Sequence, residues 1–369
     1  MLFNTFEFGF FFALVLAGYT ALPHRAQNRM LLLVSYLFYA AWDWRFCGLL
    51  AFSTALDYAV ALRIAGTADP RHRRRWVTVS LVANLSVLGA FKYAGFFADS
   101  FHDLAALFGL SLPGFAFNVV LPIGISFYTF QTLGYTLDVY RRHIEPIRDR
   151  FDYALYVAFF PQLVAGPIER ASHLLPQIRN PRRRDADGTG RGLWLVLWGL
   201  FKKVVIADNL APVVDAVYAP EASPTPAELI VATYAFTIQL YCDFSGYTDI
   251  ARGTARLLGF DIVRNFNLPY AATSPVEYWR RWHISLSTWL RDYVFFSLGG
   301  NRGKRARVAG RILITMGLGG LWHGAAWPFV LWGLFHGLWL ILHRMLLPGL
   351  KRIAPASRFG RLAWHALRV

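Results

Sequence analysis

A succession of apolar segments, separated by short polar stretches, decides what this chain can fold into. Hydrophobic residues make up 56% of its 369 residues, and its mean hydropathy is +0.36. A soluble protein of this size would carry a larger charged surface, so we predict an all-α, polytopic membrane helical bundle. The predicted spans are Phe6–Leu22, Met30–Ala41, Phe46–Ala65, Trp76–Phe97, Val119–Leu137, Leu193–Val214, Ala227–Thr248, Ile312–Trp327 and Phe329–Leu347.

The basic residues indicate how these spans are oriented. The formal net charge of +16 is, on its own, typical of nucleic-acid binding. Here, however, the arginines stand in short clusters between apolar segments, as at positions 71–75 and 141–150, which is typical of cytoplasmic loops. Residues 98–118 carry two aspartates but no lysine or arginine, so we place that loop outside. The pattern predicts a lipid bilayer, and no nucleic acid, as the partner of the chain, with the N-terminus outside.

The segment Phe151–Pro167 is apolar but does not fit as a full span. Basic loops stand on both sides of it, and Pro161, Gly166 and Pro167 would break a helix. A re-entrant or interfacial segment satisfies both observations, provided that its backbone is buried in protein or lines a cavity. We therefore predict re-entrant and interfacial helices around a central cavity, in one membrane-embedded domain over residues 1–369. The sequence contains no internal repeat, which argues against a transporter built from inverted repeats.

Residues 274–296 have the pattern of an amphipathic helix that lies along the inner membrane interface. The N-cap Ser274, followed by Pro275 and Glu277, is typical of a capping box at a helix start. Apolar residues then recur at alternating spacings of three and four, which predicts one apolar stripe along a single helix. The stripe consists of Trp279, Trp282, Leu286, Trp289, Tyr293 and Phe296.

Polar side chains are predicted along the edge of this stripe, because successive helical residues are about 100° apart. They are His283, Arg280, Ser287 and Arg291. Such a strip could hold an anionic acyl donor, for example through the phosphates of coenzyme A, by charge-assisted hydrogen bonds. An alternative is that the arginines contact lipid headgroups and that His283 caps a neighbouring backbone group.

One histidine, His323, is predicted at membrane depth. It stands twelve residues after Arg311, which we place near the inner surface. At about 1.5 Å per residue it would lie roughly 18 Å into a core of about 30 Å. Burial favours the neutral imidazole, the form that a general base needs to take a proton from an alcohol. An alternative is a packing histidine that hydrogen-bonds across the bundle, as we expect for His336 and His343 on the next span.

Charged residues elsewhere in the apolar segments are predicted to form structural ion pairs. Asp249 and Arg252 are spaced to pair within the polar stretch Tyr241–Phe260, and Asp57 is a second carboxylate at membrane depth. The two cysteines make neither a disulfide framework nor a metal-ligand spacing. No nucleophile elbow, phosphate-binding loop or zinc spacing is present in the sequence, so we expect no metal and no bound cofactor.

Several motifs resemble the membrane-bound O-acyltransferases, in the branch of the bacterial alginate O-acetylases and the related teichoic acid D-alanyltransferases. They run in the family's order from Leu121 to His336. The motif residues are Leu121–Gln131, Pro161–Arg170, Asp243–Asp249, Trp279–Tyr293 and Leu321–Gly324. Members of this family generally continue with further membrane helices, so we expect this chain to lack C-terminal helices of the family.

The resemblance implies a fold, two catalytic histidines and a reaction. His323 matches the essential histidine of the family, and His283 matches a second histidine on the cytoplasmic side. The implied donor is cytosolic acetyl-coenzyme A, with Arg280, Ser287 and Arg291 as its predicted binding residues. The implied partner is a periplasmic SGNH-type O-acetyltransferase or a polysaccharide synthesis complex, in a bacterial inner membrane.

The implied function is O-acetylation of an extracytoplasmic polysaccharide such as alginate. Transfer of D-alanyl or another acyl group to a cell-envelope polymer is an alternative within the same class. A channel or flippase that conducts a glycan and catalyses nothing is an alternative from another class.

Overall fold

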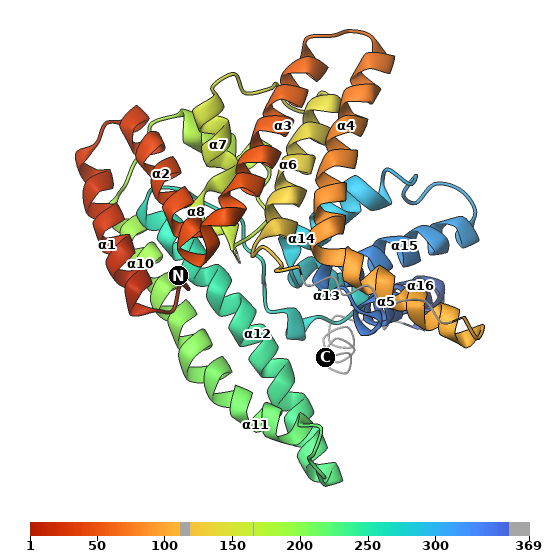
Figure 1. Ribbon diagram of the computed structural model, residues 1–369. Coiled ribbons are helices and arrows are strands. Elements are labelled where there is room, and N and C mark those ends of the chain that lie inside the picture. The colour runs from red at the N-terminus through yellow and green to blue at the C-terminus, as the bar shows by residue number, and fades with distance from the viewer. Residues whose placement is uncertain (111–118, 165, 354–369) are drawn as a thin grey trace. The chain divides into compact units, whose positions relative to one another are not determined.

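Every regular element that the structure describes is helical (Figure 1). The structure is a computed structural model that describes residues 1–110, 119–164 and 166–353. The chain forms two units, one of Met1–Leu81 with Ile123–Arg264, the other of Val82–Pro122 with Asn265–Val369. The predicted all-α fold is confirmed.

Helices overlap each of the predicted spans, with different bounds. Among the described residues, three helical stretches are long and apolar enough to cross a membrane: His24–Ala65, Pro70–Leu107 and Trp327–Gly349. Helix α1 (Phe6–Ala21) is apolar but shorter. In the first of these stretches, α2 (His24–Asp43) and α3 (Cys47–Ala65) are joined by the short 3-10 turn η1 (Trp44–Phe46).

The first unit buries a polar network between α3 and α6 (Ile125–Tyr140), together with the start of α4 (Pro70–Leu88). The fully buried carboxylate of Asp57 accepts hydrogen bonds from Ser80 Oγ and from Thr136 Oγ1, the latter at 3.2 Å. The Arg63 guanidinium lies 4.8 Å from the centre of the Trp76 ring. Hydroxyl donors therefore stabilise the buried Asp57 carboxylate.

The apolar segment at 151–167 is broken and deeply buried, as predicted. It forms α7 (Arg150–Ala158) and the single turn α8 (Phe160–Leu163), with Phe159 between them. Side chains satisfy the backbone at the break: Ser35 Oγ accepts from Phe160 N–H at 3.0 Å, and the amide nitrogens of Gln131 and Gln162 each donate to the Tyr156 carbonyl at 2.6 Å. These bonds allow a non-helical backbone to be buried away from water.

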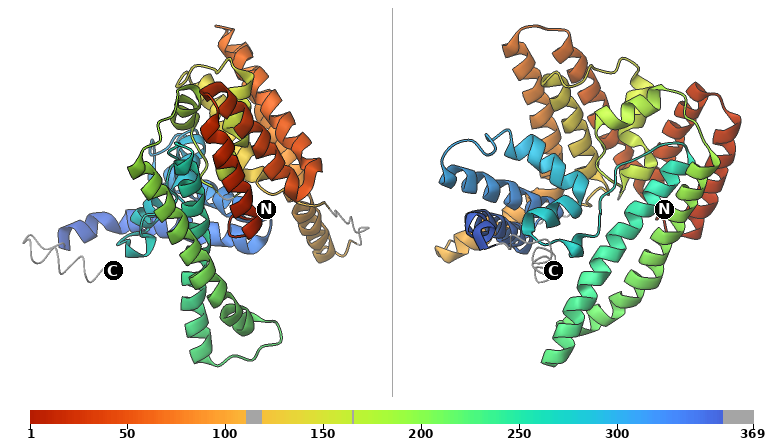
Figure 2. Two further views of the ribbon diagram at one scale, coloured as in Figure 1. Left: turned by 90° about the vertical axis from the view of Figure 1, so that its left-hand side faces the viewer. Right: turned by 180° about the vertical axis from the view of Figure 1, so that it is seen from behind.

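Helix α12 (Pro226–Leu257) continues through most of the polar stretch Tyr241–Phe260, beyond the predicted end of the span at Thr248. Figures 1 and 2 show α12 beside α10 (Ala186–Leu200), the π-helical η3 (Phe201–Ala207) and α11 (Asp208–Tyr218). The backbones pack so closely that a Cβ on Gly199 would lie 2.6 Å from the Gly246 carbonyl oxygen. Only glycine permits this approach.

Ion pairs cross this helix pair. Lys202 Nζ lies 2.6 Å from Asp249 Oδ2, and Lys203 Nζ lies 2.5 Å from Asp243 Oδ1. The predicted pair of Asp249 with Arg252 is also present, at 3.2 Å.

The second unit contains two long helices, α15 (Arg305–His323) and α16 (Trp327–Ile353), that pack against each other. The π-helical turn η2 (Gly89–Tyr93) and α5 (Ala94–Leu107) also belong to it. Short elements complete it: the 3-10 turn η4 (Pro269–Ala271), α13 (Pro275–Arg281), α14 (Ile284–Trp289) and the π-helical η5 (Leu290–Phe295).

Candidate functional site

The region 274–296 is not the single amphipathic helix that its periodicity predicts. It divides into α13, α14 and η5, with the break at Trp282 and His283. The helix begins after Ser274 as predicted, and Ser274 Oγ accepts from the Glu277 N–H at 3.2 Å. The Glu277 carboxylate accepts from the Thr273 N–H at 2.9 Å, whereas in a capping box it would accept from the N-cap residue. Most of the apolar stripe is buried, although Phe296 is 52% exposed. The spacing therefore identified four buried side chains of the six, Trp282, Leu286, Trp289 and Tyr293, but not the break in the helix.

His283 causes the break, because its backbone is left-handed (φ 41°). Its imidazole does not cap α14, and Asn265 does so from a distant position in the sequence. The Asn265 backbone carbonyl accepts from Ile284 N–H at 2.9 Å, and its side-chain oxygen accepts from the Ser285 hydroxyl at 2.6 Å. This substitute cap holds His283 in a conformation that non-glycine residues seldom adopt.

The break moves His283 away from the helix edge where the sequence placed it. The side chain is completely buried, with its ring centre 5.4 Å from that of Trp322 and 5.9 Å from that of His323. Burial, and secondarily the nearby His323 imidazole, lowers the pKa of His283 well below its usual value. The prediction of His283 on an accessible strip with the arginines is wrong, and the two histidines are instead neighbours.

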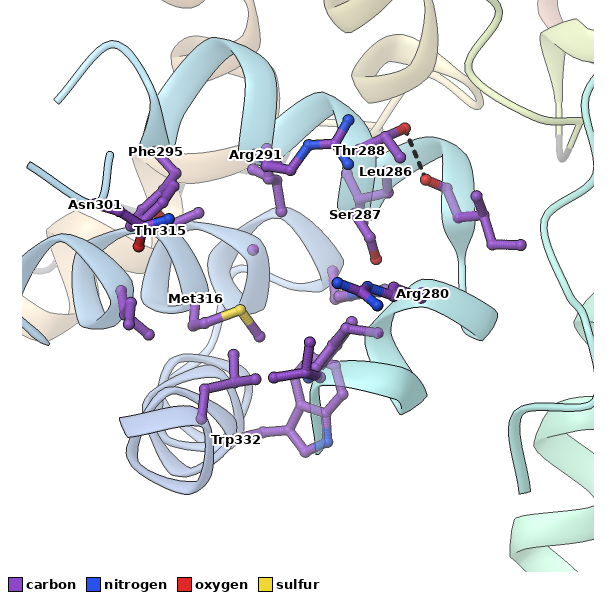
Figure 3. A pocket seen from close by; sticks show the side chains of 18 residues that line it. Arg280, Leu286, Ser287, Thr288, Arg291, Phe295, Asn301, Thr315, Met316 and Trp332 are labelled. Atoms are coloured by element: carbon purple, nitrogen blue, oxygen red, sulfur yellow. Dashed lines mark hydrogen bonds between the residues drawn. The ribbon is translucent and has the colours of Figure 1, made fainter. Parts of the chain in front are cut away.

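The other predicted site residues line one cavity of about 400 Å³ in the second unit. His323, Arg280, Ser287 and Arg291 all contribute to its wall. Figure 3 shows Ser287 and Arg280 extending toward the same space, with Met316 and Trp332 at other parts of the wall. The lining residues of this cavity lie between Val276 and Leu340.

The cavity wall combines two basic side chains with a mostly apolar surface. Arg280 is exposed, and Ser287 Oγ donates to the Trp282 carbonyl at 3.1 Å. Arg291 donates to Asp292 at 2.7 Å, and its side chain is 54% exposed. Arg280 and Arg291 can therefore meet the charged part of a ligand, while the apolar wall accommodates an uncharged part.

Aromatic rings enclose His323 on the side of α16. The Trp332 ring lies edge-on to the His323 ring, with centres 5.2 Å apart, and the His336 ring lies 4.8 Å from that of Trp332. His336 also packs against Tyr278 and Trp279, at 6.0 and 5.1 Å. It is thus a packing histidine, as its spacing suggested, and only His323 of these two lines the cavity.

The start of α13 depends on the ionised carboxylate of Glu277, which predicts a pH effect. Its bonds from Thr273 and Arg281 lower the pKa of Glu277 to about 2. Because its pKa is below the ordinary value, the ionised Glu277 carboxylate stabilises the folded state fully above pH 4.5. This stabilisation is lost as the pH falls toward 2 and the carboxylate is protonated. We expect Glu277→Gln to lower the Tm at pH 7 and the deficit to shrink steadily below pH 4.5. Glu145→Gln, at an exposed carboxylate, is the control, and a pH-independent deficit for Glu277→Gln would contradict this account.

Sequence reasoning missed three residues that hold the two histidines. Asn265 supports the backbone after His283. Lys92 Nζ donates to the Trp322 carbonyl, and Tyr93 Oη donates to the Leu321 carbonyl at 3.1 Å, directly before His323. The signal for Lys92 was a lysine inside the apolar run 76–97, since a charge at membrane depth is a functional candidate. Nothing in the local sequence identified Asn265.

The sequence profile of the membrane-bound O-acyltransferase family matches residues 143–364. The match includes His283, His323 and the basic residues of the cavity wall. It does not extend to Lys92 and Tyr93.

Three curated relatives are similar over most of this chain. A probable alginate O-acetylase of Azotobacter vinelandii is 46% identical over 93% of this chain and 68% of its own length. A probable alginate O-acetylase of Pseudomonas aeruginosa is 44% identical over 94% of this chain and 66% of its own length. A peptidoglycan O-acetyltransferase of Helicobacter pylori is 37% identical over 93% of this chain and 70% of its own length. The chain thus spans about two thirds of the length of these relatives.

Proposed function

This chain belongs to the membrane-bound O-acyltransferase family, and we propose that it carries an acetyl group from cytosolic acetyl-coenzyme A across a bacterial inner membrane. The acetyl group would be used for O-acetylation of an extracytoplasmic polysaccharide. The names of the relatives, alginate O-acetylase and peptidoglycan O-acetyltransferase, support this class of acceptor.

One observation carries the proposal: a single cavity is lined both by His323 and by the predicted donor-binding residues Arg280, Ser287 and Arg291. The arginines would bind the phosphates of the donor, and the apolar wall would accommodate its uncharged arm. His323 would take the proton from an acceptor hydroxyl while the hydroxyl oxygen attacks the thioester carbonyl carbon. The carbon–sulfur bond then breaks, and the leaving thiolate takes up the proton that His323 accepted, which returns the imidazole to its neutral form.

His283 has a supporting role in this scheme. It is buried beside His323, so it would act on the orientation and charge of His323 and would not touch the donor. This assignment replaces the donor-side role expected from the helix edge.

The proposal includes a partner and an orientation. An SGNH-type O-acetyltransferase in the periplasm, or a polysaccharide synthesis complex, would receive the acetyl group, because transport across the membrane alone does not modify a polymer. The distribution of arginines supports an N-terminus on the outside.

Mass spectrometry of the cell-surface glycan tests the function directly. Deleting the gene is expected to remove O-acetyl groups, and the wild-type gene is expected to restore them. Unchanged acetylation after deletion would contradict the proposal. D-alanyl esters lost in place of acetyl esters would assign the other acyl group. Glycan transport by purified protein without release of coenzyme A would favour a channel or flippase.

Arg280 provides a test of donor binding. Arg280→Met keeps the apolar stem but removes the guanidinium from the cavity wall, so the KM for acetyl-coenzyme A is expected to rise about tenfold, equivalent to about 1.4 kcal/mol. The kcat is expected to change less than the KM. Arg307→Met, at an exposed arginine that does not line the cavity, is the matched control. An unchanged KM in Arg280→Met would remove Arg280 from the donor site.

A further inference from the structure

The C-terminal end of α15, where His323 lies, is held by side chains from a distant part of the second unit. An α-helix leaves its last carbonyls without intrahelical partners. In α15 the Gly320 carbonyl accepts from the Gly324 N–H, while Leu321 and Trp322 turn their carbonyls toward Tyr93 and Lys92. The two carbonyls directly before His323 are therefore bound by side chains.

The π-helical turn η2 explains how two consecutive residues reach consecutive carbonyls. A π-helix has i→i+5 hydrogen bonds and so more residues per turn than an α-helix, and adjacent side chains diverge less. Lys92 and Tyr93 end this turn, and the Lys92 ammonium also lies 5.5 Å from the centre of the Trp322 ring. Such a turn within a long helix is often found at functional sites.

The segment that follows His323 is fixed from the same side. Trp327 donates its indole N–H to Ser100 Oγ at 3.1 Å, and its ring lies 5.4 Å from that of Phe96. Residues of η2 and α5 thus contact the chain on both sides of His323.

We propose that Lys92 and Tyr93 are positioning residues, which fix the end of α15 and thereby the direction of the His323 imidazole into the cavity. This inference rests on the proposed function in one respect, namely that His323 is the general base of acyl transfer. Lys92 contacts the backbone before the histidine, so it would affect the rate of transfer more than donor binding.

The rate of acyl transfer tests this role. Lys92→Met keeps the length of the side chain but removes the ammonium, and we expect kcat to fall 10- to 100-fold with the donor KM changed less than twofold. Tyr93→Phe removes one hydroxyl and is expected to lower kcat about threefold. Lys92→Arg retains a cationic donor and is expected to recover much of the rate. Wild-type kcat in both Lys92→Met and Tyr93→Phe would overturn the proposal.

A second measurement does not depend on acyl transfer. Diethyl pyrocarbonate is applied to the folded protein in detergent, and its rate of modification of His323 is read by mass spectrometry of peptides after digestion, with the exposed His72 as internal reference. Release of the helix end in Lys92→Met and Tyr93→Phe is expected to raise the His323 rate at least threefold relative to His72. An unchanged ratio would contradict the positioning role, even if the protein transfers no acyl group. If Lys92→Met does not fold, Tyr93→Phe and Lys92→Arg carry the test.

Discussion

Replacing His323 with alanine is expected to reduce acyl transfer by about 100- to 10,000-fold, the usual contribution of a general base. The imidazole lines the cavity from the last residue of α15, next to Trp332. Removing it leaves the acceptor hydroxyl without a group to take its proton, although the donor site stays intact. Release of coenzyme A by purified protein and O-acetyl content of the glycan measure the loss.

His336 provides the matched control for this prediction. It is a second histidine in contact with Trp332, but it does not line the cavity. His336→Phe keeps an aromatic ring in the same packing and is expected to retain activity within about threefold, since it removes no catalytic proton transfer. Full activity in His323→Ala would eliminate the proposed mechanism. Equal losses in the two variants would indicate that the aromatic packing, and not the base, had been disrupted.

Replacing Gly320 with valine is expected to separate α15 from α16. A Cβ at Gly320 would overlap the Phe329 carbonyl and lie 3.2 Å from Gly333 Cα, so neither backbone can yield without moving a helix. Overpacking of this kind typically costs about 1–3 kcal/mol. Gly320 is three residues before His323, so moving the helix would displace the His323 side chain. Because a displacement of about 1 Å can lower a catalytic rate strongly, acyl transfer is expected to fall at least about tenfold. Thermal unfolding in detergent and coenzyme A release measure the two effects.

Gly310 in the same helix is the control for Gly320. No atom lies within 4 Å of a Cβ built there. Gly310→Ala is expected to leave activity unchanged and to stabilise the helix by up to about 1 kcal/mol, the difference in helix propensity. If Gly320→Val matched Gly310→Ala in Tm and activity, the close contact between α15 and α16 would not be required for stability or acyl transfer.

The sequence predicted the helical class, the O-acyltransferase family and the broken segment 151–167, because hydropathy, motif order and proline placement are local signals. It did not predict the break at His283. The spacing of apolar residues predicts which side chains face the core. That spacing is regular across His283, although the backbone of His283 is in the left-handed region. The cause is the Asn265 cap, a tertiary contact with no trace in the local pattern.

The sequence predicted which residues belong to the candidate site better than it predicted how they are arranged. His323, Arg280, Ser287 and Arg291 share one cavity, although nothing in their spacing placed α15 beside α14. Their roles remain predictions. The placement of His283 at the helix edge was wrong for the reason just given. The hydrogen bond from Lys92 to the Trp322 carbonyl was missed because local sequence patterns do not reveal a partner 230 positions away in the chain.

The ion pairs between η3 and α12 have a consequence for the stability of this part of the chain in the bilayer. Lys202 and Lys203 are on one helical stretch, whereas Asp243 and Asp249 are on the other. Asp208 and Arg252 offer Lys203 and Asp249 partners within their own stretches, but Lys202 and Asp243 each pair across the two stretches. A charge left unpaired near the centre of hydrocarbon costs about 2.5–3.5 kcal/mol. Together the charges cancel, and the glycines already allow the backbones to touch. The hairpin with its ion pairs formed is therefore energetically more favourable in a membrane than either helix alone.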